Sequence, residues 1–140
     1  MSKIQTHIQQ GAVVRLAAAD LTDKENRLVI IDSTGKFDLA GANPTAPLYL
    51  LLQGGVSGAE VSAEPLIPGK RYRVRGSNVN FTLGLTVTSA ASGLLGSLTQ
   101  VAGGANLVRM AGVVEEANNL SVSDTGEILI LASNQVTIRA

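Results

Sequence analysis

The sequence predicts a mainly β fold, and three observations favour it. The apolar residues are almost all Val, Leu, Ile and Ala, with two Phe, two Tyr and no Trp, and branched aliphatics suit the half-buried surface of a sheet. Fifteen Gly and many Ser, Thr and Asn interrupt the chain at short intervals, which is typical of strands joined by tight turns. Several segments alternate polar and apolar residues. We therefore predict a small β-barrel or β-sandwich with at most one or two short helices.

The chain has 140 residues, which is the usual size of one domain with one core. Residues 1–10 are polar, rich in Gln and without a clear period, so we predict an extended, flexible N-terminal arm that becomes ordered on a partner. No linker divides the remainder, and residues 11–140 are predicted to form a single β-rich domain.

Strands are expected throughout the N-terminal half. A hairpin is the clearest prediction, because Asp32-Ser33-Thr34-Gly35 separates two apolar runs. The Asp side chain can bond the turn backbone, and Gly supplies a positive φ. Residues 20–26 have room for one helical turn. The predicted strands of this half are 11–16, 28–31, 36–39, 48–53 and 59–63.

The C-terminal half continues the pattern with strands over 70–75, 79–88, 107–114 and 135–138, and residues 90–104 leave room for a short helix. A second hairpin is expected where Leu120–Ser123 and Glu127–Leu131 flank Asp124-Thr125-Gly126. Because this repeats the plan of the first hairpin, it is compatible with an internal duplication. Convergent turn chemistry explains it equally well.

Charge and composition narrow the function classes. Eleven basic and eleven acidic residues give a net charge of zero, whereas nucleic-acid binders carry a basic footprint. There is no Cys for disulfides or thiolate chemistry. The N-terminus has no apolar stretch of the secretory type. The longest apolar run, Leu48–Leu52, has the length of a strand and cannot span a membrane. We therefore expect a protein made in the cytoplasm, without nucleic-acid or membrane partners.

No group of residues predicts catalysis. Asp124-Thr125-Gly126 matches the catalytic triplet of aspartic proteases, but that chemistry needs two Asp sharing a proton. The only counterpart, Asp32-Ser33-Thr34-Gly35, has a different spacing, so a hairpin turn is favoured. The single His, His7, lies in the predicted arm, and a zinc site without Cys is improbable. We predict a protein that is not an enzyme and has no metal or cofactor.

One local feature exceeds the background. Lys70, Arg71, Arg73 and Arg75 concentrate basic charge in one alternating strand whose opposite face carries Tyr72 and Val74. The simplest interpretation is a solvated strand face whose charge discourages edge-to-edge pairing. The functional interpretation is a contact with an acidic protein surface. Nucleic acid is disfavoured, because no stacking aromatic residue shares the basic face.

From Leu48 onward, over about two-thirds of the chain, the order of signals resembles the capsid decoration (cement) proteins of tailed bacteriophages. In that family a strand leads into a Gly-containing turn, a Pro-Gly step opens the next strand, a Gly-Val-Thr type strand follows, and a Gly-Val-Val-Glu strand precedes a final hairpin. The corresponding residues here are Leu48–Gln53 with Gly54-Gly55, Leu66–Gly69, Gly84–Thr88 with Gly93, and Met110–Ala117 before the Asp124–Gly126 hairpin.

The resemblance implies a homotrimer on the outer capsid surface of the virion, at the threefold and quasi-threefold axes, that stabilises the head by clamping neighbouring major capsid subunits. It also implies that the arm joins the capsid's own sheet by strand addition. The alternatives are another virion structural component (a tail or head–tail protein) or a small ligand-binding β module. The predicted capsid-contact residues are Ile4, Gln5, Thr6, His7, Ile8, Arg71, Arg73 and Arg75.

Overall fold

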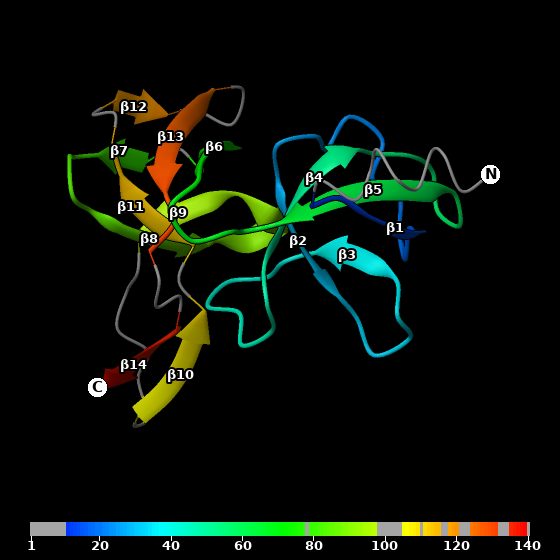
Figure 1. Ribbon diagram of the computed structural model, residues 1–140, viewed down its shortest axis with the longest axis horizontal. Coiled ribbons are helices and arrows are strands. Elements are labelled where there is room, and N and C mark those ends of the chain that lie inside the picture. The colour runs from blue at the N-terminus through cyan, green and yellow to red at the C-terminus, as the bar shows by residue number, and fades with distance from the viewer. Residues whose placement is uncertain are drawn as a thin grey trace.

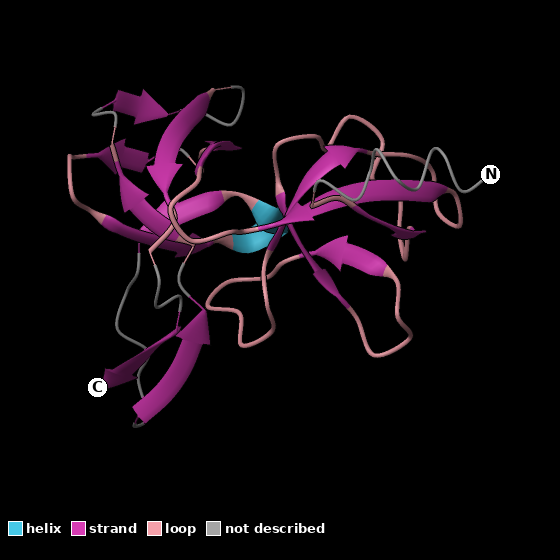
Figure 2. Cartoon of the chain, viewed as in Figure 1, coloured by secondary structure: helices cyan, strands magenta, loops and turns pink. Residues whose placement is uncertain are grey.

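Two five-stranded antiparallel sheets form most of the fold. Figure 1 shows how their strands are arranged in space. The computed structural model describes residues 11–77, 79–97, 105–109, 111–115, 118–120, 124–131 and 135–139. Strands dominate this part of the chain, and its one helical element is a 3-10 turn at Ala91–Gly93 (Figure 2). The prediction of a mainly β fold with at most one or two short helices is confirmed.

The first sheet uses the N-terminal half and the second uses the C-terminal half. The first has the order β1 (Val13–Leu16), β5 (Glu60–Pro65), β4 (Tyr49–Gln53), β2 (Leu28–Ile31), β3 (Phe37–Leu39). The second has the order β6 (Arg71–Arg75), β13 (Thr125–Leu129), β11 (Gly112–Val114), β8 (Thr86–Ser89), β9 (Leu95–Ser97). Two short ribbons accompany them: β7 (Val79–Phe81) with β12 (Asn118–Leu120), and β10 (Ala105–Arg109) with β14 (Gln135–Arg139).

The two sheets have the same topology. Without the ribbon strands β7, β10, β12 and β14, each half has five strands. Numbered one to five along the chain, both sets lie in the spatial order one, five, four, two, three. The registers agree as well: Leu51 lies opposite Ala63 in the first sheet, and Val114 lies opposite Ile128 at the same place in the second. We call residues 13–65 repeat 1 and residues 71–129 repeat 2. Positions that coincide in strand and register are called counterparts.

The turns of the two repeats agree too. The β2–β3 and β8–β9 hairpins each place a glycine of positive φ at the same turn position, Gly35 (φ 80) and Gly93 (φ 68). Before β2, the amide of Asn26 (φ 64) donates to Leu51 O over 2.9 Å. Its counterpart, Gly84 (φ 79), donates in the same way to Val114 O over 2.9 Å. Shared registers, turns and backbone bonds identify an internal duplication in the fold.

Each sheet curls until its edge strands meet at a single point. In repeat 1, Ala17 bridges Phe37 in parallel, and in repeat 2, Gly76 bridges Leu95 in parallel. Over the described residues neither sheet continues this contact into a ladder that would close a barrel. Two open sheets on a common core agree with a small β-sandwich, the second of the two predicted architectures.

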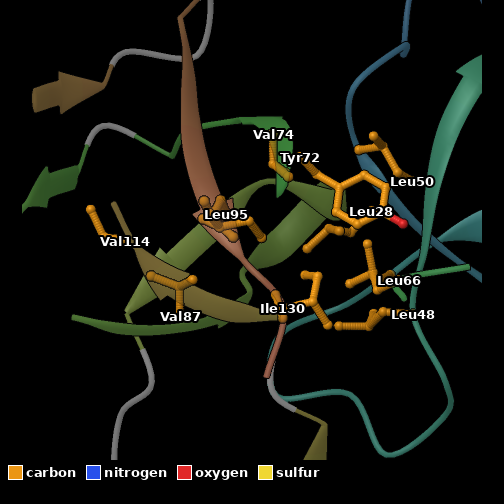
Figure 3. Close-up of a cluster of buried hydrophobic side chains, with 13 residues drawn as sticks. Leu28, Leu48, Leu50, Leu66, Tyr72, Val74, Val87, Leu95, Val114 and Ile130 are labelled. Atoms are coloured by element: carbon orange, nitrogen blue, oxygen red, sulfur yellow. The ribbon is translucent and has the colours of Figure 1, made fainter. Parts of the chain in front are cut away.

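The two repeats are packed differently. Repeat 1 encloses its own core: Ala17, Leu21, Val29, Phe37, Leu51, Val61 and Ala63 are at most 1% exposed. The interior of repeat 2 is continuous with the outer face of repeat 1, since both contribute to one second cluster. Figure 3 shows Tyr72, Val74 and Leu95 of repeat 2 gathered with Leu28 and Leu50 of repeat 1.

We call this contact between the repeats the joint, and backbone bonds reinforce it. Arg75 N donates to Asn26 O over 2.9 Å, and Gly93 N donates to Ala40 O over 2.8 Å. Tyr72 of β6 adds side-chain bonds to the end of β5 and to the residues between the repeats: its hydroxyl donates to Pro65 O (3.0 Å) and accepts from Ile67 N (3.2 Å). Both apolar packing and directed bonds therefore fix repeat 2 on repeat 1.

The predicted strands of the N-terminal half are confirmed within one or two residues. Three other predictions are wrong, one in this half and two in the C-terminal half. Residues 20–26 form turns without a helix. Residues 79–88 form two strands, because the chain turns at Gly84, and Leu83 becomes exposed. Residues 107–114 likewise belong to two strands, β10 and β11.

The predicted second hairpin is also wrong. β13 pairs with β6 and β11, while β12 pairs with β7. The counterpart of the β2–β3 hairpin is β8–β9, so the duplication is real but aligns different residues from those that the Asp-Thr-Gly turn indicates.

Candidate binding face

The basic strand predicted from sequence is β6, an edge strand of repeat 2. Tyr72 and Val74 are buried in the joint, and Arg71 and Arg73 are exposed. The predicted alternation is confirmed. Pairing with β13 places Glu127 opposite Arg73 and Leu129 opposite Arg71, so the outer face of the sheet carries acidic as well as basic groups.

Arg71 has two carboxylates within reach. Its Nε donates to Glu115 Oε2 over 2.5 Å, and its Nη2 lies 3.4 Å from Glu115 Oε1. Glu127 Oε1 lies 3.9 Å from the same Nε. The hydrogen bond to Glu115 raises the pKa of Arg71, so the guanidinium stays charged. The Arg71 side chain is still 56% exposed, and solvent therefore reaches this pair freely.

Arg73 and Arg75 differ in what they bind. Arg73 donates from Nε to Thr125 Oγ1 (3.1 Å) and from Nη2 to Thr125 O (3.0 Å), which holds it along β13. Arg75 is half-buried and donates from Nε to Glu25 O of repeat 1 over 3.0 Å. Arg71 and Arg73 thus belong to the outer face, whereas Arg75 belongs to the joint.

Lys70 completes the basic group at the start of β6. Its ammonium pairs with Glu64 and lies 5.5 Å from the centre of the Tyr72 ring. The hydrogen bond to Glu64 raises the pKa of Lys70. Burial raises the pKa of the Tyr72 hydroxyl, which stays protonated and free to donate to Pro65 O. These contacts tie the start of β6 to the end of β5.

We define the binding face as the outer face of repeat 2 around Arg71, Arg73, Glu115 and Glu127. The sequence gives no direct sign that Glu115 and Glu127 meet Arg71, because β11, β13 and β6 are far apart along the chain. The alternation of polar and apolar residues in β13 is the one feature of the sequence that places Glu127 on the outer face of the sheet. The predicted arm contacts, Ile4, Gln5, Thr6, His7 and Ile8, lie outside the described residues.

The triplet Asp124-Thr125-Gly126 lies where β13 begins. Asp124 is exposed. Asp32 is occupied by its own turn: its Oδ1 accepts from the Thr34 hydroxyl (2.7 Å), Thr34 N (2.8 Å) and Lys36 N (3.0 Å). These bonds, that from the hydroxyl first, lower the pKa of Asp32. A protease dyad requires two carboxyls sharing one proton, whereas the Asp32 carboxylate is bound within its own turn.

Two features are absent from the described residues. No cluster of three or more His, Asp or Glu side chains able to hold a metal ion occurs in the part of the chain that the structure describes. Among those same residues, no helix is long and apolar enough to cross a bilayer.

The motifs that carry the family resemblance lie on identifiable strands. Pro68-Gly69 precedes β6, Thr86–Thr88 belong to β8, and Gly112-Val113-Val114 form β11. Most of the resemblance therefore falls on repeat 2, which also bears the binding face. In comparisons with known proteins, no family model, no curated protein and no solved structure matches this chain.

Proposed function

We propose that this protein decorates the outside of a bacteriophage head as a homotrimer and stabilises the capsid by clamping neighbouring major capsid subunits. The resemblance from Leu48 onward supports the proposal, together with the character of the binding face. The N-terminal arm leads into β1, an edge strand, and an arm at such a place is suited to strand addition on the capsid's sheet.

The observation that carries the proposal is the exposed pair of Arg71 and Arg73 on a five-stranded sheet. Ion pairs at a protein surface contribute little stability, because water screens them and two long side chains lose freedom. Arg71 can therefore exchange Glu115 and Glu127 for carboxylates of a partner at small cost. Strands hold such groups more rigidly than loops do, and a repeated structural contact needs that rigidity.

The direct test is co-sedimentation of the purified protein with heads that lack it. Binding should saturate at roughly three copies per threefold position, as a symmetric trimer requires, and should raise the resistance of the heads to heat. If the protein fails to sediment with heads, the decoration role is rejected. Labelling of tails would then favour a tail or head–tail component.

The binding face is tested by Arg71→Glu together with Arg73→Glu. We expect weaker binding to heads and a smaller effect of salt on what remains, because interfacial charge pairs are screened by ions. Lys24→Glu with Lys36→Glu is the matched control, since it makes the same change of net charge in repeat 1.

Arg71→Gln with Arg73→Gln separates attraction from repulsion, because neutral side chains do not repel Glu115 and Glu127. We expect this variant to bind heads with intermediate affinity and to melt close to the wild type. Unaltered affinity in both double variants would assign the binding face to solvent and leave the arm as the capsid contact.

A further inference from the structure

The joint is a head-to-tail contact, because it uses different surfaces of two equivalent units. Repeat 1 contributes the segment before β2, and repeat 2 contributes the edge of β6. Arg75 is the centre of this edge contact: its amide donates to Asn26 O over 2.9 Å, and its Nε donates to Glu25 O over 3.0 Å. Each repeat should therefore have one surface of each kind: the segment before its second strand and the edge of its first strand. Within the chain, only one surface of each kind is in contact.

The unused edge is that of β1. Leu16 is the counterpart of Arg75, since both lie one position before the parallel bridge that joins the edge strands. Ala17 N donates to Ala59 O, so the alternation of an antiparallel ladder directs the Leu16 amide away from β5. Among the described strands, β1 has β5 as its one neighbour in the sheet, so this amide lies on the open side of an edge strand. The Leu16 side chain is 44% exposed.

The unused segment is that before β8. Leu83 and Gly84 are the counterparts of Glu25 and Asn26, as the shared bonds of Asn26 and Gly84 to β4 and β11 show. Leu83 is 68% exposed, the highest value among the large apolar side chains of the described residues. In the joint, Arg75 Nε bonds the backbone carbonyl of Glu25. At the two unused surfaces, the positions of Arg75 and Glu25 carry the exposed apolar side chains of Leu16 and Leu83.

These surfaces lie at opposite ends of the molecule. Figure 1 is drawn with the longest axis horizontal: β1 lies towards the right end, and the loop between β7 and β8, which contains Leu83, lies at the left end. They cannot meet within one chain. One end of a molecule is therefore complementary to the other end of the next.

We propose that a second copy of this chain docks head to tail, with Gly84 O accepting from the Leu16 amide of the next copy and Leu83 packing on its Leu16. Burial of two apolar side chains favours association of separate molecules, and the joint supplies the geometry. Ile30 packs against the apolar cluster that the two repeats share. Its counterpart Thr88 is already buried within its own chain, so a second copy reproduces only the edge contact and not the whole joint. A head-to-tail contact that closes gives a ring.

This inference deepens the trimer of the proposed function and takes the ring size of three from it, whereas the contact itself rests on the duplication and is tested without heads. The chain has no Cys, so Leu16→Cys with Leu83→Cys introduces one cross-linkable pair. Mild oxidation should give covalent oligomers that end at a closed ring of three copies. Leu52→Cys with Leu83→Cys is the matched control, since Leu52 is nearly as exposed as Leu16 (43%) but belongs to β4, which β5 separates from β1. Glu25→Cys with Arg75→Cys should cross-link within one chain.

Complementation tests the direction of the contact. Leu16→Asp and Leu83→Asp should each abolish assembly in sedimentation experiments, whereas Leu52→Asp, on the other side of β5 from β1, should leave it intact. A mixture of the first two should form a dimer, because each variant keeps the surface that the other lacks. The inference is overturned if the wild type stays monomeric at high concentration or if the mixture stays monomeric. It is also overturned if the control Cys pair cross-links as readily as the pair at positions 16 and 83. Binding of such a monomer to heads would leave the proposed function standing.

Discussion

The two repeats share one backbone plan but present different outer faces. In repeat 1 the outer face is apolar at Leu28 and Leu50, and repeat 2 covers it. In repeat 2 the counterparts are Thr86 and Val113, and the adjoining edge carries Arg71 and Arg73. Side chains, and not strand order, therefore decide whether an outer face becomes part of the core or stays exposed.

The interiors differ in the same sense. Phe37 fills the centre of repeat 1, and Ala17 closes its edge. Their counterparts in repeat 2 are Leu95 and Gly76, which are smaller. Side chains of repeat 1 complete the interior of repeat 2 at the joint. Repeat 2 therefore depends on repeat 1 for its core, whereas repeat 1 encloses its own.

The largest expected effect distinguishes the two outer faces. Leu28→Ala should lower the free energy of unfolding by about 3 kcal/mol, because it leaves a cavity in the joint. Thr86→Ala, at the counterpart position, should lower it by less than about 1 kcal/mol, since Thr86 is only half-buried. Urea unfolding of both variants makes the measurement. Equal losses would mean that the outer faces are equally part of the core.

The next comparison concerns the two hairpin glycines. Both have positive φ, so Gly35→Ala and Gly93→Ala should each lower the free energy of unfolding by about 1 kcal/mol through backbone strain. A Cβ on Gly93 would also lie 2.3 Å from Leu28 O, whereas the nearest atom to a Cβ on Gly35 is Arg15 Nη1 at 3.5 Å. We expect Gly93→Ala to cost about 2 kcal/mol more than Gly35→Ala in the same unfolding assay. Similar losses would place Gly93 outside the joint.

The smallest expected effect depends on pH. Hydrogen bonds in the β2–β3 turn lower the pKa of Asp32 below its ordinary value of 3.8. Its charged form therefore stabilises the fold above that value, and this contribution is lost as pH falls through the lower pKa of the folded state. Asp32→Asn should be less stable than the wild type at neutral pH, and the difference should vanish in strong acid.

Repeat 2 provides the contrast, because the corresponding turn position is Ala90 and has no carboxyl group. Thr34→Val, which removes the hydroxyl donor to Asp32, should reproduce part of the pH-dependent loss. A difference between wild type and Asp32→Asn that stays constant over the whole pH range would contradict this account of the turn.

Local pattern was enough to predict the β class, most strands and the alternation of β6. It was not enough where contacts between segments distant in the sequence decide where a strand ends and which strands pair. The run from Val79 to Thr88 alternates like one strand, but Gly84 repeats the positive φ of Asn26 and turns the chain. Only the topology makes that equivalence visible.

The site was predictable to a similar degree. Alternation indicates an exposed row of Arg, and Arg71 and Arg73 fit that prediction. Arg75 does not, because repeat 1 packs on the end of β6 and takes its guanidinium into the joint. The carboxylates near Arg71 come from β11 and β13, and pairing between such remote strands is not encoded in a local period.

The most direct test of the account compares the exchange rates of two counterpart amides, Leu16 and Arg75, by hydrogen exchange in dilute protein. Both lie on the outer edge of the first strand of a repeat, but only Arg75 is covered by the other repeat. The account predicts slow exchange at Arg75 and fast exchange at Leu16, with Leu16 becoming protected as the concentration rises. Equal rates for the two amides in dilute solution would contradict a joint that uses one edge and leaves the other open.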